Sequence, residues 1–379
     1  MSTNREIYEK LTKVNGKEYN TDIPDSNNYQ SIDTFASFLS DKHDLKSNEE
    51  LENEFAESLR TKDKDENNYF DKKHIKDFCS ADFHYKDIFD DEHGDDEFND
   101  NYLFLAMNCA LRSEDTKNKR GSWEMFHDIT DRGESQMLNL RLLTNGVNAK
   151  GCYITDALKG YEDSASDKII RNFMVKDSHY SFNNPEVNDK QRAEMLYKWD
   201  KEALDASEKS KRRKSKKEEL GIDSKHSLPK KEKDKISKDV EKLTPVNSEK
   251  DDLDIIDENR DIYNKSINVL IHELDVIFPK QVVIFGNREK APKAKGDSIK
   301  GESTTDLVNI IADSPLFRRY KKDSKKGHYH DGSELQKLLK NAISITHYSV
   351  QGKNCRDLFN EKKDSIAKAT PINIKKQLK

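Results

Sequence analysis

Four short apolar runs stand out along a chain that is otherwise rich in polar and charged residues. The runs are residues 102–107, 151–155, 281–285 and 342–346. An unbroken apolar run of this length is typical of a strand that is covered on both faces of a sheet. We therefore expect four strands in the interior of the protein.

Helical patterns separate these strands. The clearest one ends just before Pro279 and places six apolar residues on one face: Ile267, Leu270, Ile271, Leu274, Ile277 and Phe278. Residues 334–339 show a shorter pattern before the fourth strand. Short apolar strands that alternate with helices form parallel sheets with right-handed crossovers. The predicted fold class is therefore α/β, with a small four-stranded parallel sheet flanked by helices.

The remainder of the chain is too polar to bury a core along its whole length. Of the 379 residues, 33% are hydrophobic and 37% are charged, and the mean hydropathy is -1.03. Residues 1–100 carry 13 Lys and Arg against 27 Asp and Glu, with partial helical spacing at 32–39 and 51–59. Residues 201–250 carry 16 Lys and Arg against 11 Asp and Glu, and seven of the nine residues at 209–217 are basic. Segments of this composition tend to stay solvated.

These shifts in composition divide the chain into five parts. Residues 1–100 are expected to be acidic and mostly helical or partly disordered, and 101–180 to form the first half of the α/β core. Residues 181–261 are expected to be a charged insertion, largely disordered or an extended helix. We assign 262–360 to the second half of the core and 361–379 to a basic tail.

Several classes of protein are excluded by what the sequence lacks. No apolar run approaches the roughly 20 residues of a membrane-spanning helix, and residues 1–6 precede no apolar stretch, so we expect a cytoplasmic protein without a secretory signal. None of the four cysteines forms a CxxC pair. The acidic segment 87–100 lacks the spacing of a calcium loop, and His328 and His330 have no third ligand nearby. We therefore expect no metal and no cofactor.

Short polar motifs lie at the ends of the predicted strands. They are Leu-Ala-Met-Asn ending at Asn108, Tyr-Ile-Thr-Asp ending at Asp156, Phe-Gly-Asn at 285–287 and His-Tyr-Ser at 347–349. In this order the motifs resemble the uracil-DNA glycosylase superfamily, and more closely an uncharacterised bacterial branch of it. The resemblance covers about half of the chain. It implies a DNA glycosylase-like protein that binds nucleic acid and hydrolyses the N-glycosidic bond of a flipped, damaged base.

The resemblance implies two catalytic residues. Asn108 corresponds to an Asn that positions the attacking water, although Ala106 and Cys109 replace the Gly and Pro that flank it in the family. His347 corresponds to a His that donates a hydrogen bond to the leaving base. Such a preorganised donor stabilises the negative charge that develops on the base. The alternative for Asn108 is ordinary turn or capping chemistry.

The same resemblance implies the base-binding residues. Asp156 stands where the family often has an Asn that reads the flipped base, and Ser349 matches a Ser of the last motif. Trp123 or Phe126 is expected to supply the ring that stacks on the base. The alternatives are that Asp156 serves a turn and that the two aromatic residues belong to the core.

A run of basic residues provides the expected contact with phosphates. It contains Arg318, Arg319, Lys321 and Lys322, with Tyr320 between the two pairs. Lys and Arg side chains bind the nucleic-acid backbone by displacing its counterions. The alternative is a solvated face without a partner.

The expected partner is nucleic acid, DNA in particular, and we expect the protein to be a monomer. Binding of a protein partner to the acidic residues 1–100 is a further possibility. Two other functions also stay open. One is a catalytically inactive nucleic-acid or nucleobase-binding protein of the same fold, which the replacements Ala106 and Cys109 favour. The other is a protein-interaction module. Some members of the superfamily hold an iron–sulfur cluster on four cysteines, but here Cys109 and Cys152 adjoin core strands, so no cluster is expected.

Overall fold

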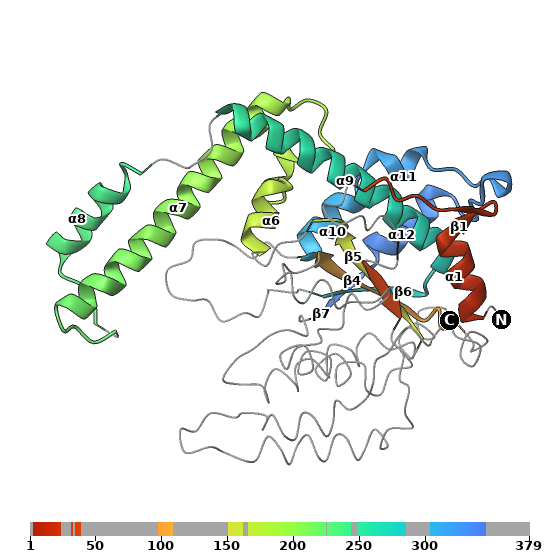
Figure 1. Cartoon of the computed structure of the whole chain (residues 1–379), viewed down its shortest axis with the longest axis horizontal. Coiled ribbons are helices and arrows are strands. Elements are labelled where there is room, and N and C mark those ends of the chain that lie inside the picture. Colours follow the sequence, from red (N-terminus) through yellow and green to blue (C-terminus); the bar gives the residue numbers. More distant parts are fainter. Residues whose placement is uncertain are drawn as a thin grey trace, which may run out of the picture. The chain divides into compact units, whose positions relative to one another are not determined.

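The computed structural model describes residues 3–23, 32, 35–38, 98–108, 151–161, 166–224, 226–243, 249–285 and 304–345. The chain divides into two units. The first takes its residues from 1–166 and 262–379, and the second comprises 167–261. The first unit contains the main sheet, and the described residues of the second are mainly helical (Figure 1).

The first unit is built on a five-stranded sheet with the spatial order β3, β5, β4, β6, β7. Its four parallel strands are β4 (Tyr102–Asn108), β5 (Tyr153–Leu158), β6 (Gln281–Phe285) and β7 (Ile343–Ile345). Each of them overlaps one apolar run, so the prediction of a four-stranded parallel sheet flanked by helices is confirmed. The first of these strands in the sequence lies between the second and the third, an order that the runs alone do not give.

β5 is longer than its apolar run predicts. The run predicts that the strand ends before Asp156, and this prediction is wrong because β5 continues to Leu158. The register with β4 sets Ala106 beside Asp156 and Asn108 beside Leu158. The ladder to β4 therefore carries Asp156 into the sheet, where it is 1% exposed. Pairing between strands outweighs the local turn preference of Asp here.

A fifth strand, β3 (Ala36–Phe38), lies at one edge of the sheet. Helical spacing is predicted over residues 32–39, and for Ala36–Phe38 this prediction is wrong. β3 pairs antiparallel with β5, and the Asp156 amide donates to the Phe35 carbonyl at 3.3 Å. The edge of β5 needs partners for its backbone groups, and that need outweighs a weak helical pattern. The helical pattern at 51–59 lies outside the described residues.

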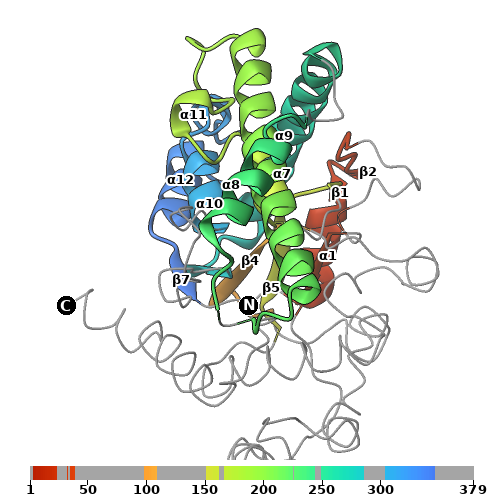
Figure 2. The same ribbon diagram turned by 90° about the vertical axis from the view of Figure 1, so that its left-hand side faces the viewer.

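Three helices cover one face of the sheet (Figures 1 and 2). They are α9 (Glu249–Ile277), α10 (Thr304–Ala312) and α12 (Gly332–Lys340). α9 ends two residues before Pro279, close to the predicted end, and α12 includes the helix predicted at 334–339. Five of the six apolar residues of the α9 pattern are buried. The exception is Phe278, which lies beyond the helix end and is 37% exposed.

The first helix of the chain is joined to α9. α1 (Asn4–Thr12) begins with a capping box between Thr3 and Glu6. At its other end, the Leu11 carbonyl lies 3.0 Å from Nε2 of buried His272 on α9. Burial lowers the pKa of His272 to about 4, so the ring is neutral at neutral pH and donates from Nε2. Part of the acidic region is therefore attached to the α/β core.

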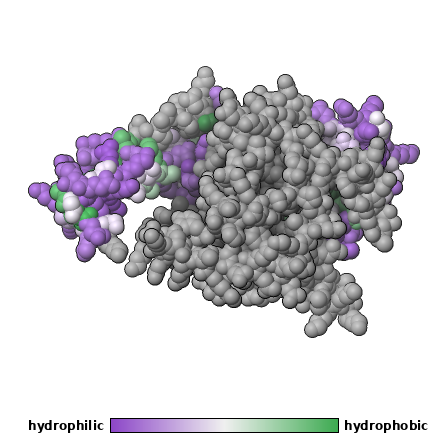
Figure 3. Space-filling model, turned by 60° about the horizontal axis from the view of Figure 1, so that its bottom comes forward, coloured by the Kyte–Doolittle hydropathy of each residue, from purple (hydrophilic) through white to green (hydrophobic). Residues whose placement is uncertain are grey.

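The second unit holds most of the charged insertion. Its helices are α6 (Ser166–Asn172), α7 (Asp189–Glu219), α8 (Lys230–Val240) and the first part of α9. α7 has 31 residues and starts with a capping box between Asn188 and Gln191. In Figure 3 the surface of α7 and α8 is mostly hydrophilic, with isolated hydrophobic side chains. No described helix combines enough length with enough apolar residues to cross a membrane.

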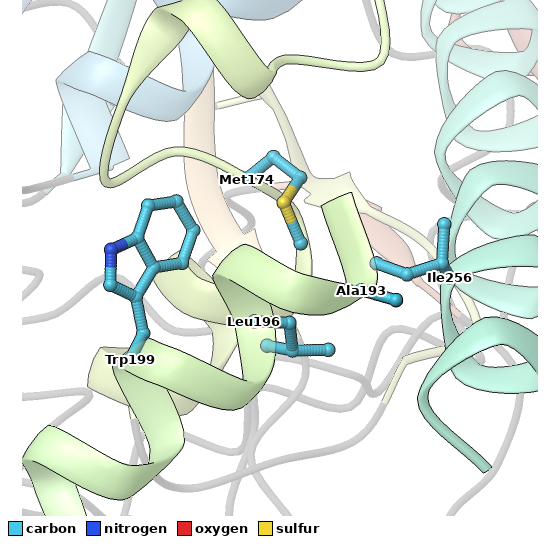
Figure 4. Packing of buried hydrophobic residues seen from close by; sticks show 5 residues of the cluster. All are labelled: Met174, Ala193, Leu196, Trp199 and Ile256. Atoms are coloured by element: carbon cyan, nitrogen blue, oxygen red, sulfur yellow. The ribbon is translucent and has the colours of Figure 1, made fainter. Parts of the chain in front are cut away.

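A small apolar core holds the second unit together. Figure 4 shows its buried residues, which are Met174, Ala193, Leu196, Trp199 and Ile256. Beside this core the buried Arg192 guanidinium donates to the carbonyls of Tyr180, Ser181 and Asn184 at 2.7–3.0 Å. These bonds fasten the loop that precedes α7, so few apolar residues suffice to order this highly charged segment.

A buried ion pair joins α9 to β5. Lys159 Nζ lies 2.8 Å from Glu273 Oε2, and both side chains are 0% exposed. The same ammonium donates to Thr155 Oγ1 at 2.8 Å and to the Asp156 carbonyl at 2.5 Å. Glu273 Oε1 accepts from the hydroxyls of Tyr153 and Thr155, each at 2.8 Å. Each charge is therefore compensated within the protein, which a buried ion pair requires.

This arrangement predicts a large loss of stability when one partner is removed. Lys159→Met leaves the Glu273 carboxylate buried without its counter-charge, and the free energy of unfolding should fall by about 3–5 kcal/mol. The double variant Lys159→Met/Glu273→Gln should lose less than the sum of the two single variants. Chemical denaturation followed by circular dichroism measures both effects. As a control, Lys340→Met removes an exposed pair with Asp313 and should cost less than about 1 kcal/mol. Additive losses would contradict the pairing.

Candidate nucleic-acid interface

Two of the predicted site residues lie on neighbouring strands of the sheet. Asn108 is the last residue of β4, and Asp156 lies within β5, opposite Ala106. The register pairs Asn108 with Leu158, and Asp156 lies two residues before Leu158 on β5. Along the strand direction they are about two residues, or roughly 7 Å, apart. The strand pairing thus brings together two residues that are 48 positions apart in the sequence.

The other residues that the resemblance implies lie outside the described residues. They are Trp123, Phe126, His347 and Ser349. Of the residues expected to act on a base, the described part of the chain therefore contains Asn108 and Asp156.

The predicted phosphate-binding residues lie on an exposed loop, residues 320–331, and on the helix before it. α11 (Pro315–Arg319) ends with Arg318 and Arg319. The loop adds Lys321, Lys322, Lys325 and Lys326, and all six basic side chains are exposed. We call residues 318–331 the basic loop. Its six basic and two acidic residues leave a formal charge of +4 when the histidines are neutral.

The basic loop has a defined backbone. Its two arms meet at an antiparallel bridge between Asp323 and His328, and the Gly332 amide donates to the Tyr320 carbonyl at 3.1 Å. A short 3-10 turn (Ser324–Lys326) joins the arms. Gly327 follows with φ 76°, a left-handed conformation that glycine adopts without strain. The loop is therefore a short hairpin and presents its basic residues in a fixed arrangement.

One buried carboxylate holds the second arm of the loop. Asp275 lies near the end of α9, and its side chain is 0% exposed. Its oxygens accept hydrogen bonds from the amides of Tyr329 at 2.8 Å and His330 at 2.6 Å. They also accept from the Tyr320 hydroxyl at 2.9 Å and lie 3.1 Å from His330 Nδ1. Asp275 thus satisfies four donors of the loop, and it joins both arms to the sheet through α9.

Aromatic stacking completes the loop. The ring of Tyr320 stacks on His328 with 4.2 Å between centroids, and Phe278 stacks on His330 at 3.7 Å and 5°. Burial and the nearby Asp275 raise the pKa of Tyr320 well above its ordinary value, so its hydroxyl keeps its proton. Tyr320, which the sequence places between the basic pairs, is therefore used to build the loop. The more exposed ring of the loop is Tyr329, at 40%.

The N-terminal elements support the loop from a second side. Asn15 lies between β1 (Lys13–Val14) and β2 (Lys17–Glu18), and its side-chain amide donates to the Lys325 carbonyl at 3.0 Å. The ammonium of Lys10 lies 5.7 Å from the centre of the Tyr329 ring. These contacts add Lys10 to the positive charge around the loop.

The basic loop lies toward the amino ends of the parallel strands. The last turn of α9, which holds Asp275, leads through Pro279 into the start of β6. Nearby, the Lys280 amide donates to the Asp100 carbonyl just before β4. Asn108 lies at the opposite, carboxyl end of β4. The two candidate regions therefore lie toward opposite ends of the parallel strands.

Comparisons with protein-family models, with curated proteins and with solved structures found no match to this chain. Within the part of the chain that the structure describes, no group of three or more His, Cys, Asp or Glu side chains is placed to bind a metal ion.

Sequence reasoning missed the two residues that define this surface, Asp275 and Tyr329. A signal for Asp275 exists, since a carboxylate between the buried Leu274 and Val276 is unusual near the end of an apolar helix. Its partners are 45 to 55 positions away, so only the tertiary structure reveals them. Tyr329 lies between two histidines and gives no periodic pattern.

The contacts of Asp275 predict that its amide variant loosens the loop. Asp275→Asn replaces one acceptor oxygen by a donor that faces N–H and O–H groups, at a cost of about 1.5–3 kcal/mol. The amides of Tyr329 and His330 should then exchange with solvent roughly 10–100 times faster, as measured by hydrogen–deuterium exchange. Asp313→Asn, on the exposed partner of Lys340, is the matched control and should leave these amides unchanged. Equal protection in both variants would show that Asp275 does not hold the loop.

Proposed function

We propose that this protein binds nucleic acid and that the basic loop is its contact with the phosphate backbone. The observation that carries the proposal is a fixed cluster of exposed and largely uncompensated positive charge. Among the described residues, the structure gives this loop only one Lys or Arg ion pair, between Lys326 and Asp323 at 3.7 Å. Both of its acidic residues also serve the backbone, because Asp323 accepts from the Lys325 amide and Asp331 from the Lys322 amide.

The charged helix α7 provides a comparison within the same chain. There Lys211 and Arg212 lie near Glu208, and Lys216 lies near Glu219. Ion pairs three or four residues apart are the usual arrangement on a solvated helix. The basic loop differs in degree, because among the described residues one of its six basic side chains has an ion pair, against three of the seven at 209–217. A positive surface of this kind attracts polyanions. This contrast favours binding over the alternative of a solvated face.

A second candidate function is cleavage of the N-glycosidic bond of a flipped base. It is favoured by the positions of Asn108 and Asp156 on neighbouring strands, near the carboxyl ends where open parallel sheets bind ligands. In this proposal Asn108 positions water, His347 stabilises the leaving base, and Asp156 reads the base. The basic loop lies toward the amino ends of the same strands. It would therefore hold a part of the nucleic acid that is remote from the reacting base.

The binding proposal predicts strongly salt-dependent affinity that falls when the loop charges are reversed. The variant with Glu at positions 318, 319, 321 and 322 should bind a labelled oligonucleotide about 100-fold more weakly. The slope of log Kd against log salt should shrink by about 0.7–0.9 for each phosphate that the loop no longer neutralises. Fluorescence anisotropy over a range of salt concentrations measures both quantities.

The control for this variant changes the same total charge elsewhere. It places Glu at positions 213, 214, 230 and 231, which are exposed basic residues of α7 and the start of α8. This control should keep most of the affinity if the basic loop is the contact. Equal losses in the two variants would show that only the net charge of the protein matters.

The second candidate predicts which base is excised. An ionised Asp can only accept hydrogen bonds, so it opposes the carbonyl oxygen of uracil, whereas an Asn both donates and accepts. The unmodified protein should therefore act poorly on uracil and better on a base with an exocyclic amino group. Asp156→Asn should shift the preference toward uracil by roughly 5- to 150-fold, the equivalent of about 1–3 kcal/mol for an opposed pair of acceptors.

The measurement is the formation of abasic sites in oligonucleotides that carry different bases. Asn108→Ala should abolish the reaction, and the exposed variant Asp313→Asn should leave it unchanged. If Asp156→Asn does not alter the preference while the unmodified protein excises uracil efficiently, Asp156 does not read the base.

A further inference from the structure

We infer that the basic loop recognises single-stranded nucleic acid, with unpaired bases stacking on Tyr329 and on the Phe278–His330 pair. This inference rests on the proposed function and adds the class of nucleic acid to it. Proteins that bind single strands combine a positive surface for the backbone with aromatic rings for the bases. Both components meet in the basic loop.

Tyr329 is presented outward by the structure around it. Its amide is fixed to Asp275, while the rings of the adjacent His328 and His330 are occupied by Tyr320 and Phe278. Tyr329 as a whole is 40% exposed, and the Lys10 ammonium lies over its ring, 5.7 Å from the centre. An exposed ring on a rigid backbone offers a stacking surface that loses little entropy when a base binds.

Phe278 provides the second surface at the expense of backbone strain. It follows the end of α9 with φ 40°, and its amide donates to the Leu274 carbonyl at 2.9 Å. Glycine usually occupies this left-handed position after a helix, because a side chain there is disfavoured. Phe278 is 37% exposed and its ring stacks on His330, so this strained aromatic residue lies beside the basic loop and not in a hydrophobic core. Strained residues that gain little from burial are found at functional sites.

The hairpin places phosphate-binding and base-binding groups side by side. The bridge between Asp323 and His328 sets the arm with Lys321 and Lys322 next to the arm with Tyr329. Residues that face each other across an antiparallel bridge have Cα atoms about 5 Å apart, so the two arms are adjacent. One nucleotide can thus contact both arms at once.

This geometry favours a single strand over a duplex. A duplex keeps the faces of its bases inside the stack, so only its phosphates reach the loop, whereas an unpaired strand offers phosphates and base faces together. The aromatic residues should therefore contribute to the binding of single strands and contribute little to the binding of duplexes.

The test compares a labelled single strand of about 20 nucleotides with the same strand annealed to its complement, by fluorescence anisotropy on the full chain. Tyr329→Ala and Phe278→Gly should each weaken binding of the single strand by about 5- to 100-fold. Each should change duplex binding less than about twofold, since the duplex reaches only the basic side chains. Tyr329→Trp keeps a stacking ring and should retain the affinity.

Two further variants guard against misinterpretation. Tyr197→Ala removes a comparably exposed tyrosine on α7, 37% exposed, and should leave both affinities unchanged. Phe278→Gly relieves the left-handed strain but removes the stack on His330, so its melting temperature and the exchange of the His330 amide are measured beside binding, and Tyr329→Ala decides the test if either changes.

The outcomes separate the inference from the proposed function. If charge reversal in the basic loop weakens both probes but Tyr329→Ala and Phe278→Gly weaken neither, the protein binds phosphates alone and single-strand recognition is wrong. Tighter binding of the duplex than of the single strand would also overturn it. If the unmodified protein binds neither probe, the proposed function itself fails.

Discussion

The last turns of α9 carry two buried carboxylates that face in different directions, and the arrangement of the first unit depends on them. Glu273 and Asp275 are two residues apart, which is about 200° around a helix. Glu273 forms an ion pair with Lys159, the residue that follows β5, while Asp275 accepts four donors of the basic loop. A buried charge is costly unless it is paired and hydrogen-bonded. If β5 or the basic loop moved away from α9, one of these buried carboxylates would lose its partners, at a large cost in free energy.

The same helix connects the core to the start of the chain. His272, adjacent to Glu273, binds the Leu11 carbonyl and stacks on Tyr19 with 3.9 Å between ring centroids. α1 and the strand pair that follows it then support the basic loop through Asn15 and Lys10. One helix thus positions the sheet, the amino-terminal elements and the basic loop relative to one another. Such rigidity matters for recognition, because a loop that is already ordered loses less entropy when it binds.

The fold separates Asn108 and Asp156 from the basic run. Asn108 and Asp156 lie near the carboxyl ends of β4 and β5, while the basic loop lies beside the end of α9 that leads into the amino end of β6. A nucleic acid that contacted both regions would run along the strand direction, from the carboxyl ends to the amino ends of the parallel strands. Binding of nucleic acid at the basic loop therefore does not require catalysis at Asn108 and Asp156.

The sequence by itself determined the secondary structure where one periodic signal dominates. The runs that became β4 and β6 and the pattern that became α9 are apolar at the right spacing, and local burial requirements decide such elements. The sequence also indicated the basic residues, because charge is a property of composition. It did not determine that Ala36–Phe38 is a strand or that Asp156 lies inside one, since both follow from hydrogen bonding to a neighbouring strand. Only the tertiary structure decided how Asp275 reaches Tyr329 and His330 from more than 50 positions away. Contacts between distant residues depend on how the elements pack, and the local pattern of polar and apolar positions carries no record of that packing.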